Sequence, residues 1–178
     1  GLNVATFHAF GYEILKKHCK HLGRSEKFSI LSEEEKLSLI QDTVGFNRQK
    51  AKEAAQIIKE AKQNLQSLEK EQRNSPRSIF ASYEEKIKKS DSFDIDDCLY
   101  RPLILFSRFP SLLNQYKNKF SHMLVDEFQD INFAQYQMIK TLMPEQKANI
   151  TIIGDPDQAI YGFRGADVHF IEDFLKDY

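Results

Sequence analysis

Apolar residues recur at helical spacing through most of the first 119 residues. Residues 7–22 carry them at intervals of three and four positions, and Gly23 follows as a stop, which predicts a helix. Ser32 and Glu35 have the spacing of a capping box ahead of a second amphipathic helix. The same periodicity predicts further helices over residues 48–72, 76–89, 95–107 and 110–119.

The pattern changes after residue 121. "HMLVDE" is a short apolar run typical of a strand, "NFAQYQMIKTLM" predicts an amphipathic helix, and "NITIIGD" predicts a second strand. The loop "PDQAIYGFRGA" and a helix from Asp167 follow, and Asn3–Thr6 is another β-capable run. Strand, helix and strand in this order predict a parallel sheet. We therefore expect an α/β fold interrupted by a helical insertion across about residues 24–118.

The composition is that of a globular protein. Of the 178 residues, 41% are hydrophobic and 29% are charged, which argues against a disordered chain. No apolar run approaches the ~20 residues that a membrane helix needs, and the first residues lack the pattern of a signal peptide. Cys19 and Cys98 lie far apart in the sequence, without a CxxC motif or a Cys/His cluster. We therefore expect reduced thiols in a cytoplasmic protein with no membrane partner.

The small net charge of −1 hides an asymmetry. Residues 48–90 hold eleven Lys and Arg against six Glu and no Asp, which gives this block a net charge of +5. A basic block beside an acidic remainder can face a polyanion. It can equally be the solvated surface of a helix, and charge alone leaves both interpretations open.

Two acids, Asp126 and Glu127, directly follow the first strand of the predicted sheet. Acids at this position lie at the carboxyl edge of a parallel sheet, where α/β proteins bind ligands. One carboxylate can bind Mg²⁺ together with waters and phosphates, and its neighbour can orient or deprotonate a water. A helix N-cap or a surface acid pair is the structural alternative, which the dipeptide alone leaves open. Asp130 could cap the following helix while Gln129 reaches another site.

The loop after the second strand carries polar and aromatic side chains. One helix separates the two strands, so we expect both strand ends at one edge of the sheet. Gln158 can donate and accept hydrogen bonds, which suits sensing a terminal phosphate, and Arg164 offers a fixed fork for a carboxylate or phosphate. Tyr161 and Phe163 flank a glycine, where they could stack on bases or be buried within the loop.

On these residues the sequence resembles the UvrD/Rep-type (superfamily 1A) DNA helicases. "LVDEFQDIN" is similar to their Walker B motif II, "IIGDPDQAIYGFRGA" to their motif III, and "TFHAFG" at Thr6–Gly11 to their motif Ib. "FDIDDCL", residues 93–99, is similar to an acidic segment between these motifs. The matches fall in the family's order and span nearly the whole chain, and motifs II and III are long and specific.

The resemblance implies an ATP site. Asp126 would bind Mg²⁺, Glu127 would activate the water that attacks the γ-phosphate, and Gln158 would sense that phosphate. Tyr161 and Arg164 would couple this site to DNA. ATP and Mg²⁺ are thus the expected cofactors of a complete protein that couples ATP hydrolysis to movement on single-stranded DNA and to duplex unwinding.

The resemblance also implies a DNA path and further partners. Thr6, Phe7 and His8 would lie along that path, although His8 can also be an ordinary residue of a helix N-terminus. Phe163 stands where the family usually has a tryptophan that stacks on a single-stranded base, and it keeps a stacking face with less area. The expected partners are single-stranded and duplex DNA, ATP, and the remaining helicase domains.

The implied fold is a partial RecA-like P-loop NTPase parallel sheet, domain 1A, over residues 1–23 and 119–178. A mostly α-helical 1B subdomain over residues 24–118 would interrupt it, and the basic block within that subdomain could meet duplex DNA. Ile95 and Cys98 depart from the family's acidic segment. Its three remaining acids are expected to have a structural role in capping a helix: Asp94, Asp96 and Asp97.

The printed sequence has no GxxxxGK[ST] motif and therefore no P-loop lysine. Motif Ia and the family's C-terminal motifs with their arginine finger are also absent. Because positioning and charge stabilisation supply most of phosphoryl-transfer catalysis, we expect no useful ATP hydrolysis by the isolated chain. A helicase–nuclease, or a DNA- or protein-binding module without chemistry, are the alternative functions.

Overall fold

The structure of the chain is a computed structural model, and it describes residues 2–45, 47–65, 76–143, 149–158 and 169–178. It is mostly helical with small parallel sheets, which confirms the α/β class. The chain divides into two compact units, Gly1–Pro102 and Leu103–Tyr178. The predicted boundaries at residues 23 and 118 concern domains of a whole protein and stay a prediction. None of the helices in the described ranges has the length and hydrophobicity that a membrane span requires.

The N-terminal helix of the first unit forms as its sequence predicts. α1 (Phe7–His18) begins after Thr6, whose hydroxyl accepts a hydrogen bond from a backbone N–H of the first turn. A 3₁₀ turn, η1 (Cys19–Leu22), continues it and ends at Gly23, where a φ of 67° favours glycine. The predicted β-run at Asn3–Thr6 is wrong, because this segment forms no strand and its last residue serves as the helix cap.

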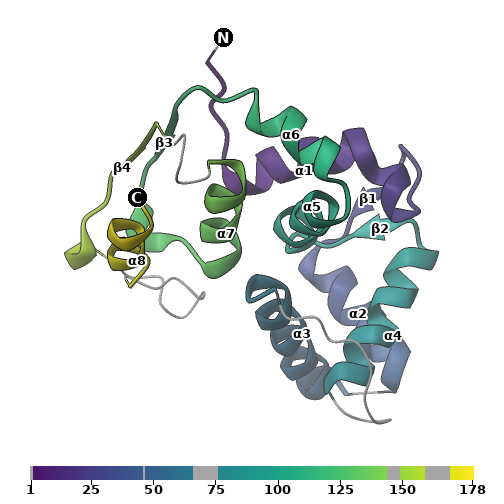
Figure 1. Cartoon of the computed structure of the whole chain (residues 1–178). Coiled ribbons are helices and arrows are strands. Elements are labelled where there is room, and N and C mark those ends of the chain that lie inside the picture. The colour runs from purple at the N-terminus through teal and green to yellow at the C-terminus, as the bar shows by residue number, and fades with distance from the viewer. Residues whose placement is uncertain (1, 46, 66–75, 144–148, 159–168) are drawn as a thin grey trace. The chain divides into compact units, whose positions relative to one another are not determined.

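Three helices form the body of the first unit (Figure 1). α2 (Glu33–Val44) begins at the predicted capping box, in which the Ser32 hydroxyl and the Glu35 carboxylate each accept the other residue's backbone N–H. α3 (Arg48–Gln63) and α4 (Pro76–Lys89) pack against it. Their shared apolar core consists of Ile40, Ala51, Ala54, Ala55, Ile58, Ala61, Phe80, Tyr83 and Ile87.

Two features of this unit differ from the expectation. α3 ends at Gln63 rather than near residue 72, and residues 66–75 lie outside the described residues. A two-stranded parallel sheet pairs β1 (Ser29–Ile30) with β2 (Ser92–Phe93). Strands of two residues are too short to show an alternating pattern, which is why the sequence did not indicate them.

α5 (Asp97–Arg108) follows β2 and lies against α1 at a point where only glycine fits. A Cβ on Gly11 would overlap the backbone carbonyl of Cys98. Cys98 and Cys19 are both buried free thiols, as the sequence predicts. They share an apolar cluster with Leu15 and Phe93, so the two cysteines serve packing here.

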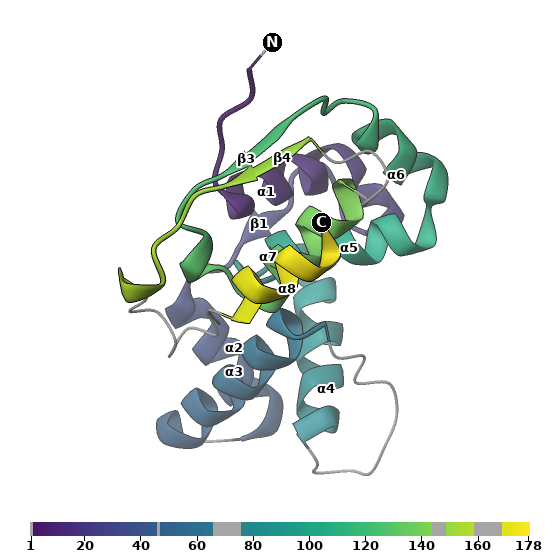
Figure 2. The ribbon, with the colours of Figure 1, turned by 60° about the vertical axis from the view of Figure 1, so that its left-hand side comes forward.

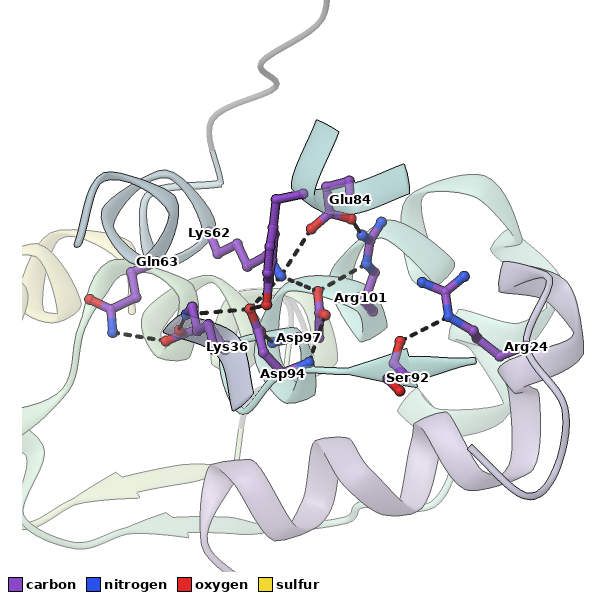
Figure 3. Close-up of polar contacts among 11 residues, drawn as sticks. Arg24, Lys36, Lys62, Gln63, Glu84, Ser92, Asp94, Asp97 and Arg101 are labelled. Atoms are coloured by element: carbon purple, nitrogen blue, oxygen red, sulfur yellow. Dashed lines mark hydrogen bonds and ion pairs between the residues drawn. The ribbon is translucent and has the colours of Figure 1, made fainter. Parts of the chain in front are cut away.

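A buried cluster of charged side chains ties α2 and α3 to the acidic segment after β2 (Figure 3). Lys62 lies 2.9 Å from a carboxylate oxygen of Asp94 and 2.9 Å from one of Asp97. Lys36 lies 3.0 Å from Asp96 and 3.3 Å from Asp94. These five side chains are at most 5% exposed, so each charge depends on its partners.

Two further groups complete the cluster. The Tyr83 hydroxyl donates to Asp94 at 2.8 Å. Arg101 pairs with Asp97 at 3.0 Å and also with Glu84, which in turn lies 3.0 Å from Lys62 (Figure 3). The cluster therefore connects α2, α3, α4 and α5 through polar contacts rather than through apolar packing alone.

The pKa shifts follow from burial and from these partners. Burial opposes ionisation of Asp94, but the charges of Lys62 and Lys36 prevail and lower its pKa. Burial raises the pKa of Asp97, and the neighbouring Asp94 adds to that shift. Burial works against the charge of Lys62, yet the carboxylates of Asp97 and Asp94 raise its pKa. The lysine stays charged wherever the fold is intact at ordinary pH.

The predicted structural role of the acidic segment agrees with its contacts. The carboxylate of Asp94 accepts the N–H of Asp97 at 2.9 Å, and that of Asp97 accepts the N–H of Asp94 at 3.1 Å. This reciprocal pair stabilises the start of α5. The ion pairs with Lys36 and Lys62 were not expected.

The second unit contains the predicted parallel strands. β3 (Met123–Val125) pairs in parallel with β4 (Ile150–Ile152) (Figure 2). Val125 lies opposite Ile152. Val125 is buried whereas Leu124 is exposed, so one face of the pair packs inward. Both strands run in the same direction, and their carboxyl ends lie side by side.

The helices of this unit pack through aromatic rings. α6 (Pro110–Lys117) precedes β3, α7 (Phe133–Leu142) connects the two strands, and α8 (His169–Asp177) ends the chain. The Tyr136 ring of α7 stacks on Phe170 of α8 at a centroid distance of 5.0 Å. The predicted helices are thus present, and the first two end within two residues of their expected bounds.

We predict that Lys62→Met destabilises the first unit by about 3–5 kcal/mol, because it leaves buried carboxylates without their shared cation. Urea unfolding followed by circular dichroism measures this change. Lys89→Met is the matched control, since Lys89 pairs with Glu85 on the surface of α4 and its loss should leave the unfolding free energy nearly unchanged. Equal stabilities of the two variants would contradict the role of the cluster.

Candidate functional site

The acid pair lies where β3 ends. Asp126 and Glu127 are both exposed, directly after the buried Val125. Glu127 has φ 51° and ψ 44°, a left-handed conformation that costs a non-glycine residue on the order of 1 kcal/mol. Its backbone N–H donates to a carboxylate oxygen of Asp126 at 3.0 Å. The backbone therefore turns sharply here and presents both carboxylates at the strand end.

Gln129 holds the Glu127 side chain. It belongs to a 3₁₀ turn, η2 (Phe128–Asp130), and is only 1% exposed. Its Nε2 donates to Oε2 of Glu127 at 2.6 Å. Its Oε1 accepts the backbone N–H of Asp155 at 3.1 Å. One buried amide thus contacts the ends of both strands.

The end of β4 lies beside the acid pair. The N–H of Phe128 donates to the carbonyl of Ile153 at 2.9 Å, so the segments that follow β3 and β4 stay in contact beyond the strands. Asp155 then organises a 3₁₀ turn, η4 (Pro156–Gln158). Its carboxylate accepts the N–H of Asp157 at 3.0 Å and the side-chain amide of Gln158 at 2.8 Å.

The predicted meeting of the two strand ends is therefore observed. Asp126 and Glu127 share one edge with the turn that carries Gln158. Tyr161, Phe163 and Arg164 lie outside the described residues, and their predicted roles stay predictions.

The predicted cap at Asp130 is wrong. The chain makes the η2 turn first, so α7 begins only at Phe133 and its N-cap is Asn132. The Asn132 side chain accepts the N–H of Gln135, and Gln135 returns the contact by accepting the N–H of Asn132 at 2.8 Å. Oδ1 of Asp130 is buried and has no hydrogen-bond partner within the part of the chain that the structure describes.

The carboxylate oxygens at the end of β3 suit a cation that takes most of its ligands from water and from substrate phosphates. Across the described ranges, no group of three or more His, Cys, Asp or Glu side chains is placed to hold a metal ion. Mg²⁺ commonly uses one or two carboxylates and fills its remaining positions with waters and substrate phosphates. Asp126 is exposed and uses one oxygen for the Glu127 N–H, so this residue fits that binding mode and would not suit a closed metal cage.

The predicted DNA-contacting residues lie in the first unit, at the start of α1. Thr6 is exposed, while Phe7 and His8 are half-buried. Burial lowers the pKa of His8, the nearby Asp96 opposes this shift, and Lys59 adds to it. His8 is accordingly neutral at neutral pH and can act as a hydrogen-bond donor or acceptor but not as a cation.

The sequence pattern missed two parts of this site. Asp155 has no specific signal of its own, because an acid before Pro-Asp in a loop is typical of an ordinary turn. Gly154 has a weak one, since a glycine directly after a β-branched strand can signal a close backbone approach. Here a Cβ at residue 154 would lie 2.6 Å from Oε1 of Gln129.

Known proteins resemble this chain over nearly its whole length. The model of the UvrD/REP helicase N-terminal domain matches residues 1–178. The ATP-dependent DNA helicase Rep of Buchnera aphidicola subsp. Baizongia pistaciae is 33% identical over 185 aligned positions, which cover 99% of this chain and 28% of that protein. The ATP-dependent DNA helicase PcrA of Staphylococcus aureus is 32% identical over 187 positions, covering 98% of this chain and 26% of that protein.

A further PcrA, from Staphylococcus epidermidis, is 31% identical over 187 positions, with 98% of this chain and 26% of the relative covered. The chain spans about a quarter of the length of the curated relatives it matches.

Proposed function

We propose that this chain, which belongs to the family of UvrD/REP helicase N-terminal domains, is a segment of an ATP-dependent DNA helicase. The parent protein would couple hydrolysis of Mg-ATP to movement on single-stranded DNA and to duplex unwinding. One observation carries this proposal: the Asp126–Glu127 pair lies at the carboxyl end of a parallel strand, beside the turn that ends in Gln158.

The proposed ATP site assigns a role to each of these side chains. Asp126 would hold the Mg²⁺ of Mg-ATP, and the ion would neutralise the charge that develops on the phosphates during hydrolysis. Glu127 would orient and deprotonate the attacking water, and its exposed carboxylate leaves room for that water. Gln158 would sense the γ-phosphate, exchanging its present contact with Asp155 for the phosphate oxygen. Arg164 would complete the catalytic set.

The proposed DNA path uses two stretches. Thr6, Phe7 and His8 would contact single-stranded DNA at the start of α1, with the neutral His8 donating a hydrogen bond. Tyr161 and Phe163 would offer aromatic faces to bases.

The proposed domains follow the family pattern. Residues 1–23 and 119–178 would belong to the RecA-like domain 1A, and residues 24–118 would form the 1B subdomain. The three packed helices α2, α3 and α4 support an insertion with its own core. The basic block at 48–90 would meet duplex DNA, and the remaining helicase domains would complete the ATP site.

We predict that the isolated 178-residue chain does not hydrolyse ATP at a useful rate. It has no GxxxxGK[ST] motif, so a main source of phosphate positioning is missing. Phosphate release in the presence and absence of single-stranded DNA measures this, with the full-length protein assayed in parallel. DNA-stimulated turnover by the purified chain would contradict the prediction.

We predict that Glu127→Gln in the full-length protein lowers kcat at least 100-fold, since it removes the proposed base, while nucleotide affinity stays within a few fold. Steady-state ATPase assays and nucleotide titration separate the two effects. Glu172→Gln, on the exposed side of α8, is the matched control and should behave as wild type. Near-normal turnover by Glu127→Gln would rule out this ATP site.

We predict that Phe163→Ala weakens binding of single-stranded DNA roughly 5- to 100-fold, as expected for the loss of one base-stacking contact. Fluorescence anisotropy at several salt concentrations measures the affinity. The dependence on salt should stay as in wild type, because a stacking contact releases no counterions. Phe163→Trp restores a larger stacking face and should bind at least as tightly as wild type. Unchanged affinity of Phe163→Ala would favour burial of this ring within its loop.

A further inference from the structure

The buried amide of Gln129 has a donor and an acceptor that serve different parts of the site. The Nε2 group donates to Glu127 at 2.6 Å, and the Oε1 atom accepts from the Asp155 backbone at 3.1 Å. Glu127 follows β3 and Asp155 follows β4, so the amide spans the two strand ends. With 1% of its surface exposed, the side chain has little freedom to exchange these partners for water.

Glu127 depends on this contact for its orientation. Its carboxylate accepts one side-chain hydrogen bond among the described residues, and that bond comes from Gln129. The Glu127 backbone has already turned into the left-handed region, which directs the side chain away from the strand path. An exposed glutamate would otherwise sample several rotamers, and the donor on Gln129 selects among them.

The β4 side fixes the amide in turn. The Asp155 N–H donates to Oε1 of Gln129. Residue 154 is a glycine, and a Cβ at this position would lie only 2.6 Å from the same oxygen. A Cβ there would also lie 3.1 Å from the backbone nitrogen of Phe128. A displacement of residues 154 and 155 must therefore move the amide, and with it the donor that holds Glu127.

We propose that Gln129 is a positioning residue that holds Glu127 in its reactive orientation and links that orientation to the turn bearing Gln158. This inference rests on the proposed function of Glu127 as the water-activating base. The required side chain must donate to one partner and accept from the other at the same time, which a primary amide does and an ionised carboxylate does not.

The test uses the full-length protein with saturating single-stranded DNA and compares kcat with KM for ATP. Gln129→Met keeps the side-chain length but removes both polar contacts. It should lower kcat about 10- to 100-fold, as expected when a catalytic group is misplaced by about 1 Å, with KM for ATP within about threefold. Gln115→Met, at an exposed position of α6, is the matched control and should keep both constants.

Two further variants test the link from each side. Gly154→Ala adds a Cβ that displaces the Gln129 amide from the β4 side. It should lower kcat in the same way, although Gln129 and Glu127 themselves are unchanged in this variant. Gln129→Glu keeps the acceptor for Asp155 but, when ionised, has no donor for Glu127. It should therefore lower kcat as Gln129→Met does, with KM for ATP within about threefold.

The outcomes separate this inference from the proposed function. If Glu127→Gln abolishes turnover while Gln129→Met and Gly154→Ala keep wild-type kcat, the positioning role is wrong and the base assignment stands. Wild-type kcat of Gln129→Glu would also overturn it, since that variant keeps the contact with Asp155 and loses only the donor to Glu127. Should Gln129→Met fail to fold, the constants of Gly154→Ala and Gln129→Glu decide the matter.

Discussion

A polar or charged group taken out of water must find a partner inside the protein, and this constraint shapes both units. In the first, the buried ammonium groups of Lys36 and Lys62 are matched by the carboxylates that follow β2. In the second, the buried amide of Gln129 is matched by the ends of β3 and β4. In each unit, the buried groups have partners that lie far from them in the sequence.

Parallel pairing of β3 and β4 brings the buried amide of Gln129 beside two exposed carboxylates. Because β3 and β4 run in the same direction, the segments that follow them leave the sheet at one edge. The hydrogen bond from Phe128 to Ile153 keeps these segments together. The exposed carboxylates of Asp126 and Glu127 therefore lie beside Asp155 and the η4 turn that follows it. The rigid strand positions the backbone, and the left-handed turn at Glu127 redirects the side chain.

Sequence reasoning succeeded where local signals decide the structure. The capping box at Ser32, the glycine stop at Gly23 and the two parallel strands could all be predicted from short patterns. It failed where distant residues decide. A lysine in an Ala/Lys/Glu-rich helix suggests a solvated face, yet the acids after β2 draw Lys62 inside. The link through Gln129 likewise depends on the register of β4, which no local pattern reveals.

The proposed function places ATP hydrolysis at the end of β3 in the full-length protein. A crystal structure of that protein with Mg²⁺, ADP and fluoroaluminate is the sharpest test. We expect the metal on Asp126 and an in-line water within about 3 Å of the Glu127 carboxylate, with Gln129 still donating to Glu127. A nucleotide bound away from Asp126 and Glu127 would contradict it.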